Sequence, residues 1–124
     1  MAKVLIVEDN PANMTLAIFL LQSAGHTVLS AADAEIGMRL ARDEQPNLIL
    51  MDIQLPGMDG LEATALLKRD DATRAIPVIA LTALAMKGDE ERIRAAGCDG
   101  YIAKPLEYRN FLATISAQLV TARL

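Results

Sequence analysis

Acidic, hydroxyl and basic side chains stand at the ends of four apolar runs in this 124-residue sequence. Glu8 and Asp9 follow the first run, Asp52 follows the third, Thr82 the fourth and Lys104 the fifth. Three carboxylates brought together would repel one another unless a cation joins them. Hard oxygen ligands without cysteine or histidine favour Mg²⁺, for which Mn²⁺ can substitute, and such a site accepts phosphate oxygen. The set therefore predicts phosphoryl transfer with Asp52, which follows the most buried run, as the nucleophile.

Each of these residues also has an ordinary structural interpretation when it is taken alone. Glu8 and Asp9 suit a helix N-terminus, and Asp52 suits a turn before a Pro-Gly pair. Thr82 suits a helix cap, and Lys104 suits the protein surface. Coincidence is a poor explanation for such residues at the ends of four of the five runs, so their joint occurrence favours the chemical interpretation.

Five apolar runs of strand length recur along the chain, and segments with helical character separate them. The runs are Lys3–Val7, Thr27–Ala31, Asn47–Met51, Pro77–Leu81 and Gly100–Ala103. Three of them are continuously apolar, as is typical of strands covered on both faces. The alternation predicts an α/β fold with a doubly wound parallel five-stranded sheet. Ligands bind at the carboxyl ends of such strands, so the chemical residues should converge at one edge.

Capping residues and apolar spacing place the helices. Asn10 is expected to cap the first helix and Asp33 to open the second, and the third helix is expected from about Asp59 to Arg69. The last helix is expected from Leu106, where apolar residues recur at helical spacing. The expected buried stripe of that helix comprises Tyr108, Phe111, Leu112, Ile115 and Leu119.

The fourth helix, about Gly88 to Ala96, differs from the others because it is rich in charge. Acidic residues come first and arginines last, an order that suits the helix dipole. Ile93 is its one strongly apolar residue, so little surface is available to anchor it. We expect this helix to be the least firmly held, and two alternatives stay open: it is an ordinary solvated surface helix, or it moves or contacts a partner.

Composition excludes several classes of protein. A net charge of −4 without a basic block argues against nucleic-acid binding. The single cysteine, Cys98, rules out an internal disulfide and a cysteine-based zinc site, and it fits a reducing compartment. No apolar run approaches the ~18 residues of a membrane span, and the first residues do not resemble a signal peptide. We expect one domain over residues 1–124, located in the cytoplasm, with no binding to membrane.

Four stretches, VLIVEDN, LILMDIQLPGMDG, VIALTA and YIAKP, carry a resemblance to a known family. From Lys3 to about Val120 the chain resembles the receiver domain of bacterial two-component response regulators. The stretch AMKGDEERIRAAGCDGYIAKP is most similar to single-domain regulators of the DivK cell-division type. The resemblance implies a flavodoxin-like (βα)5 fold with strand order 2-1-3-4-5. It also implies that there is no output domain, because only about 19 residues follow Pro105.

The resemblance implies a role for each residue that matches the family pattern. Asp52 is the expected phosphoacceptor, with Lys104 and Thr82 as its catalytic partners. Thr82 and Tyr101 form the expected switch pair, and Pro105 is expected to follow Lys104 through a cis peptide bond. The expected Mg²⁺ ligands are Glu8, Asp9, Asp52 and the backbone carbonyl of Gln54.

The same resemblance implies a signalling protein that catalyses only its own phosphorylation and slow self-dephosphorylation. A sensor histidine kinase or histidine phosphotransfer protein would donate the phosphoryl group in a phosphorelay. The phosphorylated protein would then change its affinity for a downstream protein partner. We expect that partner at the face of the fourth helix, fifth strand and fifth helix, and we expect a monomer or a weak phosphorylation-dependent dimer.

Two alternatives are retained. The chain could be a receiver module that acts as a shuttle or phosphate sink in a hybrid-kinase phosphorelay. It could also be an aspartyl-phosphate phosphatase that acts on small molecules. Phosphatases that resemble the haloacid dehalogenase family need a second Asp two residues after the nucleophile, where this chain has Gln54. The phosphatase alternative is therefore the least favoured.

Overall fold

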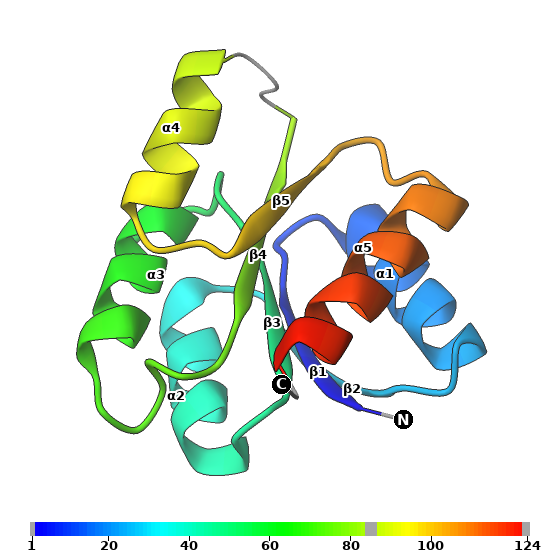
Figure 1. The fold of residues 1–124 in the computed structure, drawn as a ribbon, viewed down its shortest axis with the longest axis horizontal. Coiled ribbons are helices and arrows are strands. Elements are labelled where there is room, and N and C mark those ends of the chain that lie inside the picture. Colours follow the sequence, from blue (N-terminus) through cyan, green and yellow to red (C-terminus); the bar gives the residue numbers. More distant parts are fainter. Residues whose placement is uncertain (1, 84–86, 123–124) are drawn as a thin grey trace.

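A parallel sheet lies between two layers of helices in the computed structural model, which describes residues 2–83 and 87–122 (Figure 1). Within those residues the strands are β1 (Lys3–Val7), β2 (Thr27–Ala31), β3 (Leu48–Asp52), β4 (Val78–Thr82) and β5 (Gly100–Ala103). The helices are α1 (Pro11–Ser23), α2 (Ala34–Glu44), α3 (Gly60–Arg69), α4 (Lys87–Ala95) and α5 (Tyr108–Ala122). All neighbouring strands are parallel, in the order β2-β1-β3-β4-β5. The predicted fold class and strand order are confirmed.

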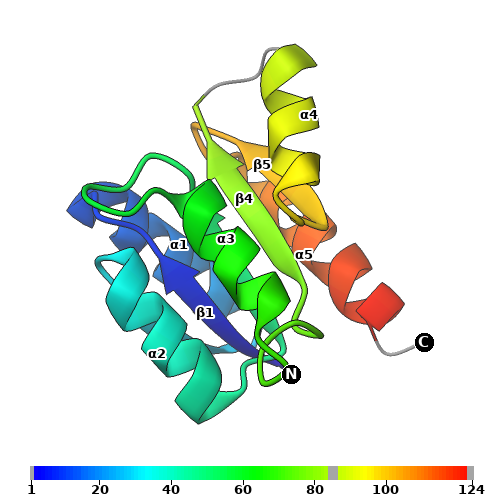
Figure 2. The same cartoon turned by 90° about the vertical axis from the view of Figure 1, so that its left-hand side faces the viewer.

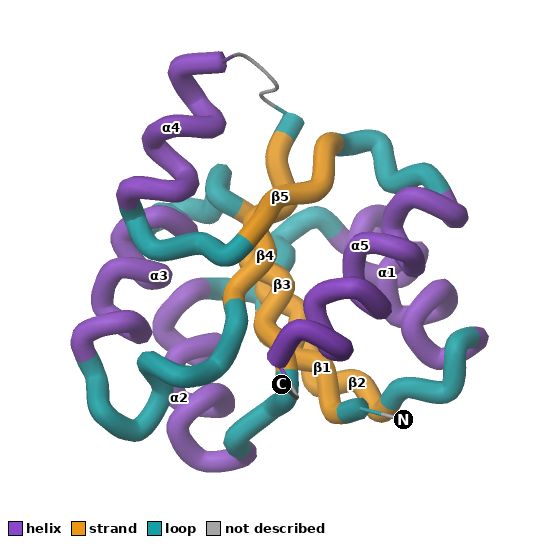
Figure 3. Tube along the Cα trace, in the orientation of Figure 1, coloured by secondary structure: helices purple, strands orange, loops and turns teal. Residues whose placement is uncertain are grey.

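Successive residues of the central strands pack on opposite faces of the sheet, as strand geometry requires. In β1, Val4 and Ile6 join the core that α1 and α5 cover, whereas Leu5 and Val7 join the core beneath α2, α3 and α4. Figure 2 shows α2 and α3 on the near side of the sheet and α1 on the far side, and Figure 3 shows the strands running between the two layers. Because β3 and β4 are buried along their whole length, the residues at their ends are held rigidly.

The first three helices begin where they are expected, and each has a side-chain cap. Asn10, Asp33 and Asp59 each accept a hydrogen bond from the backbone N–H three residues later, at 3.0, 2.8 and 2.9 Å respectively. Each such cap contributes about 1 kcal/mol to the stability of its helix. The caps therefore set where each helix begins after the strand that precedes it.

Two expectations about the elements need correction. Strands β3 and β4 run one residue further than expected, so Asp52 and Thr82 are their last residues. Helix α5 begins at Tyr108 rather than Leu106, and Tyr108 is 56% exposed instead of buried. Leu106, ahead of the helix, packs against the core in its place. The rest of the stripe is correct, since Phe111, Ile115 and Leu119 are buried and Leu112 is partly buried.

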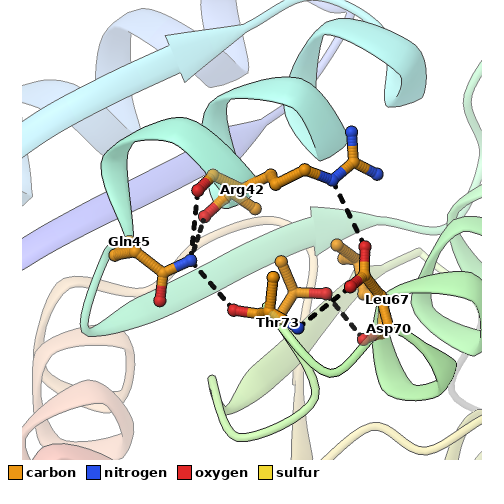
Figure 4. Close-up of polar contacts among 7 residues, drawn as sticks. Arg42, Gln45, Leu67, Asp70 and Thr73 are labelled. Atoms are coloured by element: carbon orange, nitrogen blue, oxygen red, sulfur yellow. Dashed lines mark hydrogen bonds and ion pairs between the residues drawn. The ribbon is translucent and has the colours of Figure 1, made fainter.

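A network of hydrogen bonds around Gln45 ties α2 to the segment that follows α3, at the edge of the sheet away from the strand carboxyl ends (Figure 4). Gln45 has a positive φ of 47° at the end of α2. Its side-chain amide donates to the carbonyls of Ala41, Arg42 and Ala72 at 3.3, 3.1 and 2.9 Å. Arg42 also pairs with Asp70 at 3.2 Å. These contacts hold α2 against the segment after α3 at this edge of the sheet.

No helix within the described part of the chain is long and apolar enough to cross a membrane.

Candidate functional site

Four strands deliver their carboxyl ends to one edge of the sheet, and polar residues stand at those ends. Glu8 directly follows β1, Asp52 ends β3, Thr82 ends β4 and Lys104 directly follows β5. Glu8, Asp52 and Thr82 are buried, with exposed fractions of 2%, 3% and 0%. Charged groups are almost never buried without partners, so this edge needs a compensating arrangement.

Lys104 provides that compensation. Its Nζ lies 2.8 Å from Glu8 Oε1 and 3.0 Å from Asp52 Oδ2. The Lys104 backbone N–H donates to the Thr82 carbonyl at 2.7 Å, which fixes the start of the loop after β5. The Lys104–Pro105 peptide bond is cis, as expected. One ammonium group thus faces two buried carboxyl groups from different strands.

Three acidic side chains lie close enough to hold one cation. One oxygen each from Glu8, Asp9 and Asp52 lies within 4.8 Å of the others. Asp9 is exposed, whereas Glu8 and Asp52 are buried, so the cluster is open to solvent on one side. Mg²⁺ keeps several waters and binds through one or two carboxylates, so this donor set suits it.

A buried oxygen supports the same conclusion. Glu8 Oε1 forms the ion pair with Lys104, yet it accepts no hydrogen bond of acceptable geometry from the described residues. Buried polar atoms are normally satisfied, and an exception in a cluster of acids marks a position suited to a cation. The residues present therefore fit a magnesium ion.

Burial and crowding shift the pKa values of the two buried carboxyl groups, Glu8 and Asp52, in opposite directions. Burial, with the nearby Asp52, raises the pKa of Glu8 to about 7, although Lys104 and the Asn10 N–H oppose the rise. Burial also acts to raise the pKa of Asp52, but hydrogen bonds from Glu8, the Gln54 N–H and Lys104 lower it below its usual value. Asp52 is thus the group that keeps its negative charge, as a nucleophile requires.

The backbone around Asp52 is held from two directions. The Gln54 N–H donates to Asp52 Oδ1 at 2.9 Å, while the Gln54 side chain is exposed. At Gly60, the first residue of α3, an added Cβ would collide with the carbonyl oxygen of Asp52. Gly60 was missed in the sequence, where Asp59-Gly60 indicates only the start of a helix. The metal-binding role of the Gln54 carbonyl stays a prediction.

Tyr101 lies on β5 and is not part of the carboxylate cluster. Its side chain is half-buried, and its hydroxyl lies 3.4 Å from Glu90 Oε2 on α4. Thr82 stands at the end of the neighbouring strand β4, where it pairs in register with Ala103. The two expected switch residues therefore come from adjacent strands, and Tyr101 contacts a helix that sequence analysis had singled out.

Helix α1, which begins beside the site, presents an apolar surface that was not predicted. It contains no charged residue, and its exposed side includes Leu16 and Phe19, which are 40% and 65% exposed. A shallow groove of about 650 Å³ is lined by Pro11, Ala12, Thr15, Leu16 and Phe19. Exposed apolar patches on a small protein commonly mark an interaction surface.

Comparison with known proteins gives consistent matches over nearly the whole chain. The model of the response regulator receiver domain matches residues 4–116. The polar-differentiation response regulator DivK of Brucella anthropi is 52% identical over 116 residues, which are 94% of each chain. A CheY-like receiver domain protein from Methanospirillum hungatei has a TM-score of 0.91 and 30% identity, with 99% of this chain and 97% of that chain covered.

One solved structure bears on the acidic cluster. The receiver domain of the sensor histidine kinase PA1611 from Pseudomonas aeruginosa has a TM-score of 0.88 and 36% identity. The match covers 95% of this chain and 97% of that chain. That structure has a magnesium ion coordinated in its active site cleft.

Proposed function

The chain belongs to the response regulator receiver domain family, and we propose that it works as a single-domain, DivK-type regulator phosphorylated on Asp52. The observation that carries the proposal is the contact of one ammonium with two buried carboxyl groups: Lys104 Nζ lies 3.0 Å from Asp52 Oδ2 and 2.8 Å from Glu8 Oε1. That arrangement keeps Asp52 ionised and places a positive charge where phosphoryl oxygens would arrive.

The phosphodonor in this family is a histidine kinase or a histidine phosphotransfer protein. In the proposed step a carboxylate oxygen of Asp52 attacks phosphorus, a new P–O bond forms, and the P–N bond to the donor imidazole breaks. The imidazole nitrogen leaves with the bonding electron pair, and the product is an acyl phosphate on Asp52. Lys104 then shifts its ion pair from the Asp52 carboxylate to a phosphoryl oxygen.

Glu8, Asp9, Asp52 and the Gln54 carbonyl would hold Mg²⁺. When bound, the ion neutralises negative charge on the phosphoryl oxygens and on the acidic cluster. Lys104 and the Gln54 N–H orient the Asp52 carboxylate through both of its oxygens. Mn²⁺ has the same preference for hard oxygen ligands and should substitute.

The apolar side of α1 is the surface we propose for the phosphodonor. Its first residues adjoin the site, because Glu8 Oε2 accepts the Asn10 N–H at 3.2 Å and Asn10 caps the helix. A donor that brings a phosphohistidine to Asp52 must cover this rim of the site. The uncharged surface with Leu16 and Phe19 offers such a protein an apolar contact.

The output follows from repacking near β5. In the proposed switch the Thr82 hydroxyl moves to the phosphoryl group, Tyr101 turns inward, and α4 repacks on β5. The affinity for a downstream protein at the face of α4, β5 and α5 then changes, and a weak dimer through this face is a further consequence. The free, buried Cys98 suits the cytoplasm as the place of action.

Labelling with a phosphodonor tests the assignment. The protein is incubated with Mg²⁺ and labelled acetyl phosphate or a phosphorylated histidine phosphotransfer protein, and the label on the chain is measured. We expect stoichiometric labelling of the native protein and loss of at least about 100-fold in Asp52→Asn. Asp59→Asn is the matched control, since Asn also caps helices. Equal labelling of Asp52→Asn and the native protein would overturn the assignment.

The shuttle alternative gains some support from the 36% identity with the receiver domain of a sensor histidine kinase. A shuttle returns its phosphoryl group to a histidine, whereas an output regulator keeps it until hydrolysis. A chase of the labelled protein with unphosphorylated histidine phosphotransfer proteins separates the two. Rapid return of label to histidine would favour the shuttle.

A further inference from the structure

Strand β2 forms one edge of the sheet, and its outer side has no partner strand within the part of the chain that the structure describes. The Thr27 N–H donates to the Ala2 carbonyl at 2.8 Å, so the backbone groups of Thr27 face β1. Backbone groups of successive residues alternate in direction along a strand of a parallel pair. The N–H and carbonyl groups of Val28 and Ser30 therefore point away from the sheet.

This edge lacks the features that commonly keep edge strands from pairing with other chains. Such strands often carry lysine, proline or a bulge. Strand β2 has the sequence TVLSA, and it follows β1 in continuous register without a bulge. Residues 10–32 contain no Asp, Glu, Lys or Arg, and both Thr27 and Ser30 are exposed. The outer side of β2 is therefore open to a further strand.

An apolar strip on α2 borders the same edge. Arg42 pairs with Asp70, just after α3, and so marks the side of α2 that faces α3 (Figure 4). Leu40 and Ile36 lie two and six residues before Arg42. At about 100° per residue they lie on the opposite side of the helix, toward β2. Ile36 is 41% exposed and Leu40 is partly buried, so apolar side chains flank the open edge.

We propose that a second copy of this chain pairs with β2, so that two antiparallel β2 strands join the two sheets around a twofold axis. The pairing goes beyond the proposed function and does not depend on phosphorylation. Charge favours a second copy at this edge. Two chains with a net charge of −4 each repel one another, but a contact between their β2 strands brings no like charges together.

The spacing of the elements suits this arrangement. Helix α2 packs on both β1 and β2, and neighbouring strands lie about 4.8 Å apart. A helix centred between these strands lies about 5 Å from the twofold axis, so the two copies of α2 would lie about 10 Å apart, a usual packing distance for helices. Ile36 and Leu40 of both copies would then fill the space between the helices. The antiparallel arrangement directs the two carboxyl edges to opposite ends of the dimer, so both sites stay open.

Sedimentation equilibrium over a range of protein concentrations tests the proposal. The contact is small, so we expect a transient dimer with a Kd of about 0.1–1 mM, with or without a phosphodonor. The Kd should fall as the salt concentration rises, because salt screens the repulsion between like-charged copies. A native protein that stays fully monomeric at about 1 mM, or a Kd that rises with salt, would overturn the proposal.

Two variants locate the contact. Ser30→Pro removes an outward N–H from each copy, and edge strands tolerate proline where the N–H faces solvent. The loss of two hydrogen bonds should raise the Kd about tenfold or more. Ile36→Ser should also raise the Kd about tenfold, because it removes apolar area from the contact, and its exposed position keeps the chain folded.

Matched controls accompany these variants. Ser30→Thr keeps the outward N–H, and Leu66→Ser removes an apolar side chain that is 38% exposed on α3. Both should keep the native Kd. A native Kd in folded Ser30→Pro and Ile36→Ser proteins would place the interface elsewhere and contradict the proposal.

NMR gives an independent readout. The amide signals of Val28 and Ser30 should shift as the protein concentration rises. Shifts confined to α4, β5 and α5 would contradict pairing through β2, as would a monomer whose β2 binds only an extended peptide of another protein. Asp52→Asn should keep the native Kd, so failure of the proposed phosphorylation leaves this inference standing.

Discussion

Lys104 Nζ lies 3.0 Å from Asp52 Oδ2, although the two residues are 52 positions apart and strand β4 separates their strands in the sheet. The long lysine side chain spans that strand and meets Asp52 and Glu8 at once. This contact keeps one of two crowded carboxyl groups ionised. In the proposed reaction it would also supply positive charge to the incoming phosphoryl group.

Replacing Lys104 should slow phosphorylation without removing the acceptor. The Lys104→Met side chain has a similar length but no charge. The rate of labelling by acetyl phosphate should fall about 10- to 100-fold, because the variant lacks the fixed positive charge that stabilises the negative charge on the phosphoryl oxygens in the transition state. Lys104→Arg should recover part of the rate. Lys3→Met is the control, since the Lys3 side chain is 39% exposed and pairs with Glu44 at the other edge of the sheet. Equal rates for Lys104→Met and the control would contradict the role of Lys104.

Magnesium affinity should depend on pH through Glu8. The pKa of Glu8 is raised to about 7 in the metal-free protein, so below pH 7 a proton must leave before the carboxylate binds Mg²⁺. The apparent Kd should rise about tenfold for each pH unit below 7 and level off above 7. Titration calorimetry in buffers of different ionisation enthalpy should detect the released proton.

The same raised pKa has a consequence for stability. The folded metal-free protein binds more protons than the unfolded chain between the ordinary glutamate pKa of 4.5 and the raised pKa of about 7, so its free energy of unfolding should fall as pH rises through that window. Added Mg²⁺ should reverse the fall near pH 7. The side chain of Glu8→Gln cannot ionise, so this substitution should flatten the pH profiles of both the apparent Kd for Mg²⁺ and the free energy of unfolding. A native profile as flat as that of Glu8→Gln would disprove the assignment to Glu8.

Adding a methyl group at Gly60 should displace the backbone of Asp52 without changing its side chain. The Cβ of Gly60→Ala would meet the Asp52 carbonyl, so the start of α3 must shift away from β3. We expect a loss of about 1–3 kcal/mol in the free energy of unfolding, measured with urea, and slower labelling of Asp52. Gly88→Ala is the matched control, because nothing lies within 4 Å of its added Cβ in helix α4. The control should be neutral or slightly stabilising, by up to about 1 kcal/mol.

The apolar side of α1 should matter only when the phosphodonor is a protein. Phe19→Ser should slow transfer from a cognate histidine kinase or phosphotransfer protein about tenfold or more, because an exposed aromatic at a contact surface contributes strongly to binding. Labelling by acetyl phosphate and the free energy of unfolding should change little, since Phe19 is 65% exposed. Profiling against the histidine kinases of the organism identifies the donor to use.

Ile36→Ser is the matched control for Phe19→Ser, because Ile36 is an exposed apolar residue on α2. It should leave both reactions unchanged. If Phe19→Ser slowed phosphorylation by acetyl phosphate as well as by the protein donor, the site itself would be distorted. If Phe19→Ser left both rates unchanged, α1 would be excluded as the docking surface.

The sequence by itself determined the architecture and the edge at which chemistry is concentrated. Continuous apolar runs are a local property that two-sided burial requires, so they predict buried parallel strands before any contact is known. Parallel strands share one carboxyl edge, which is why Glu8, Asp52, Thr82 and Lys104 could be placed together from their positions alone. The helix starts expected at Asn10, Asp33 and about Asp59 are equally local, and each of these residues caps its helix in the structure.

Other features were decided only by tertiary structure, because they depend on distances between segments remote in the chain. The buried stripe of α5 was misjudged at Tyr108, which is exposed, while Leu106, ahead of the helix, packs on the core. The need for glycine at Gly60 comes from the approach of α3 to β3, and the Glu90–Tyr101 contact comes from how α4 lies on β5. The raised pKa of Glu8 likewise depends on tertiary structure, because folding buries Glu8 and brings Asp52 close to it. Residue types and periodicity name the groups and the edge they occupy, whereas three-dimensional packing sets which atoms touch and which group keeps its charge.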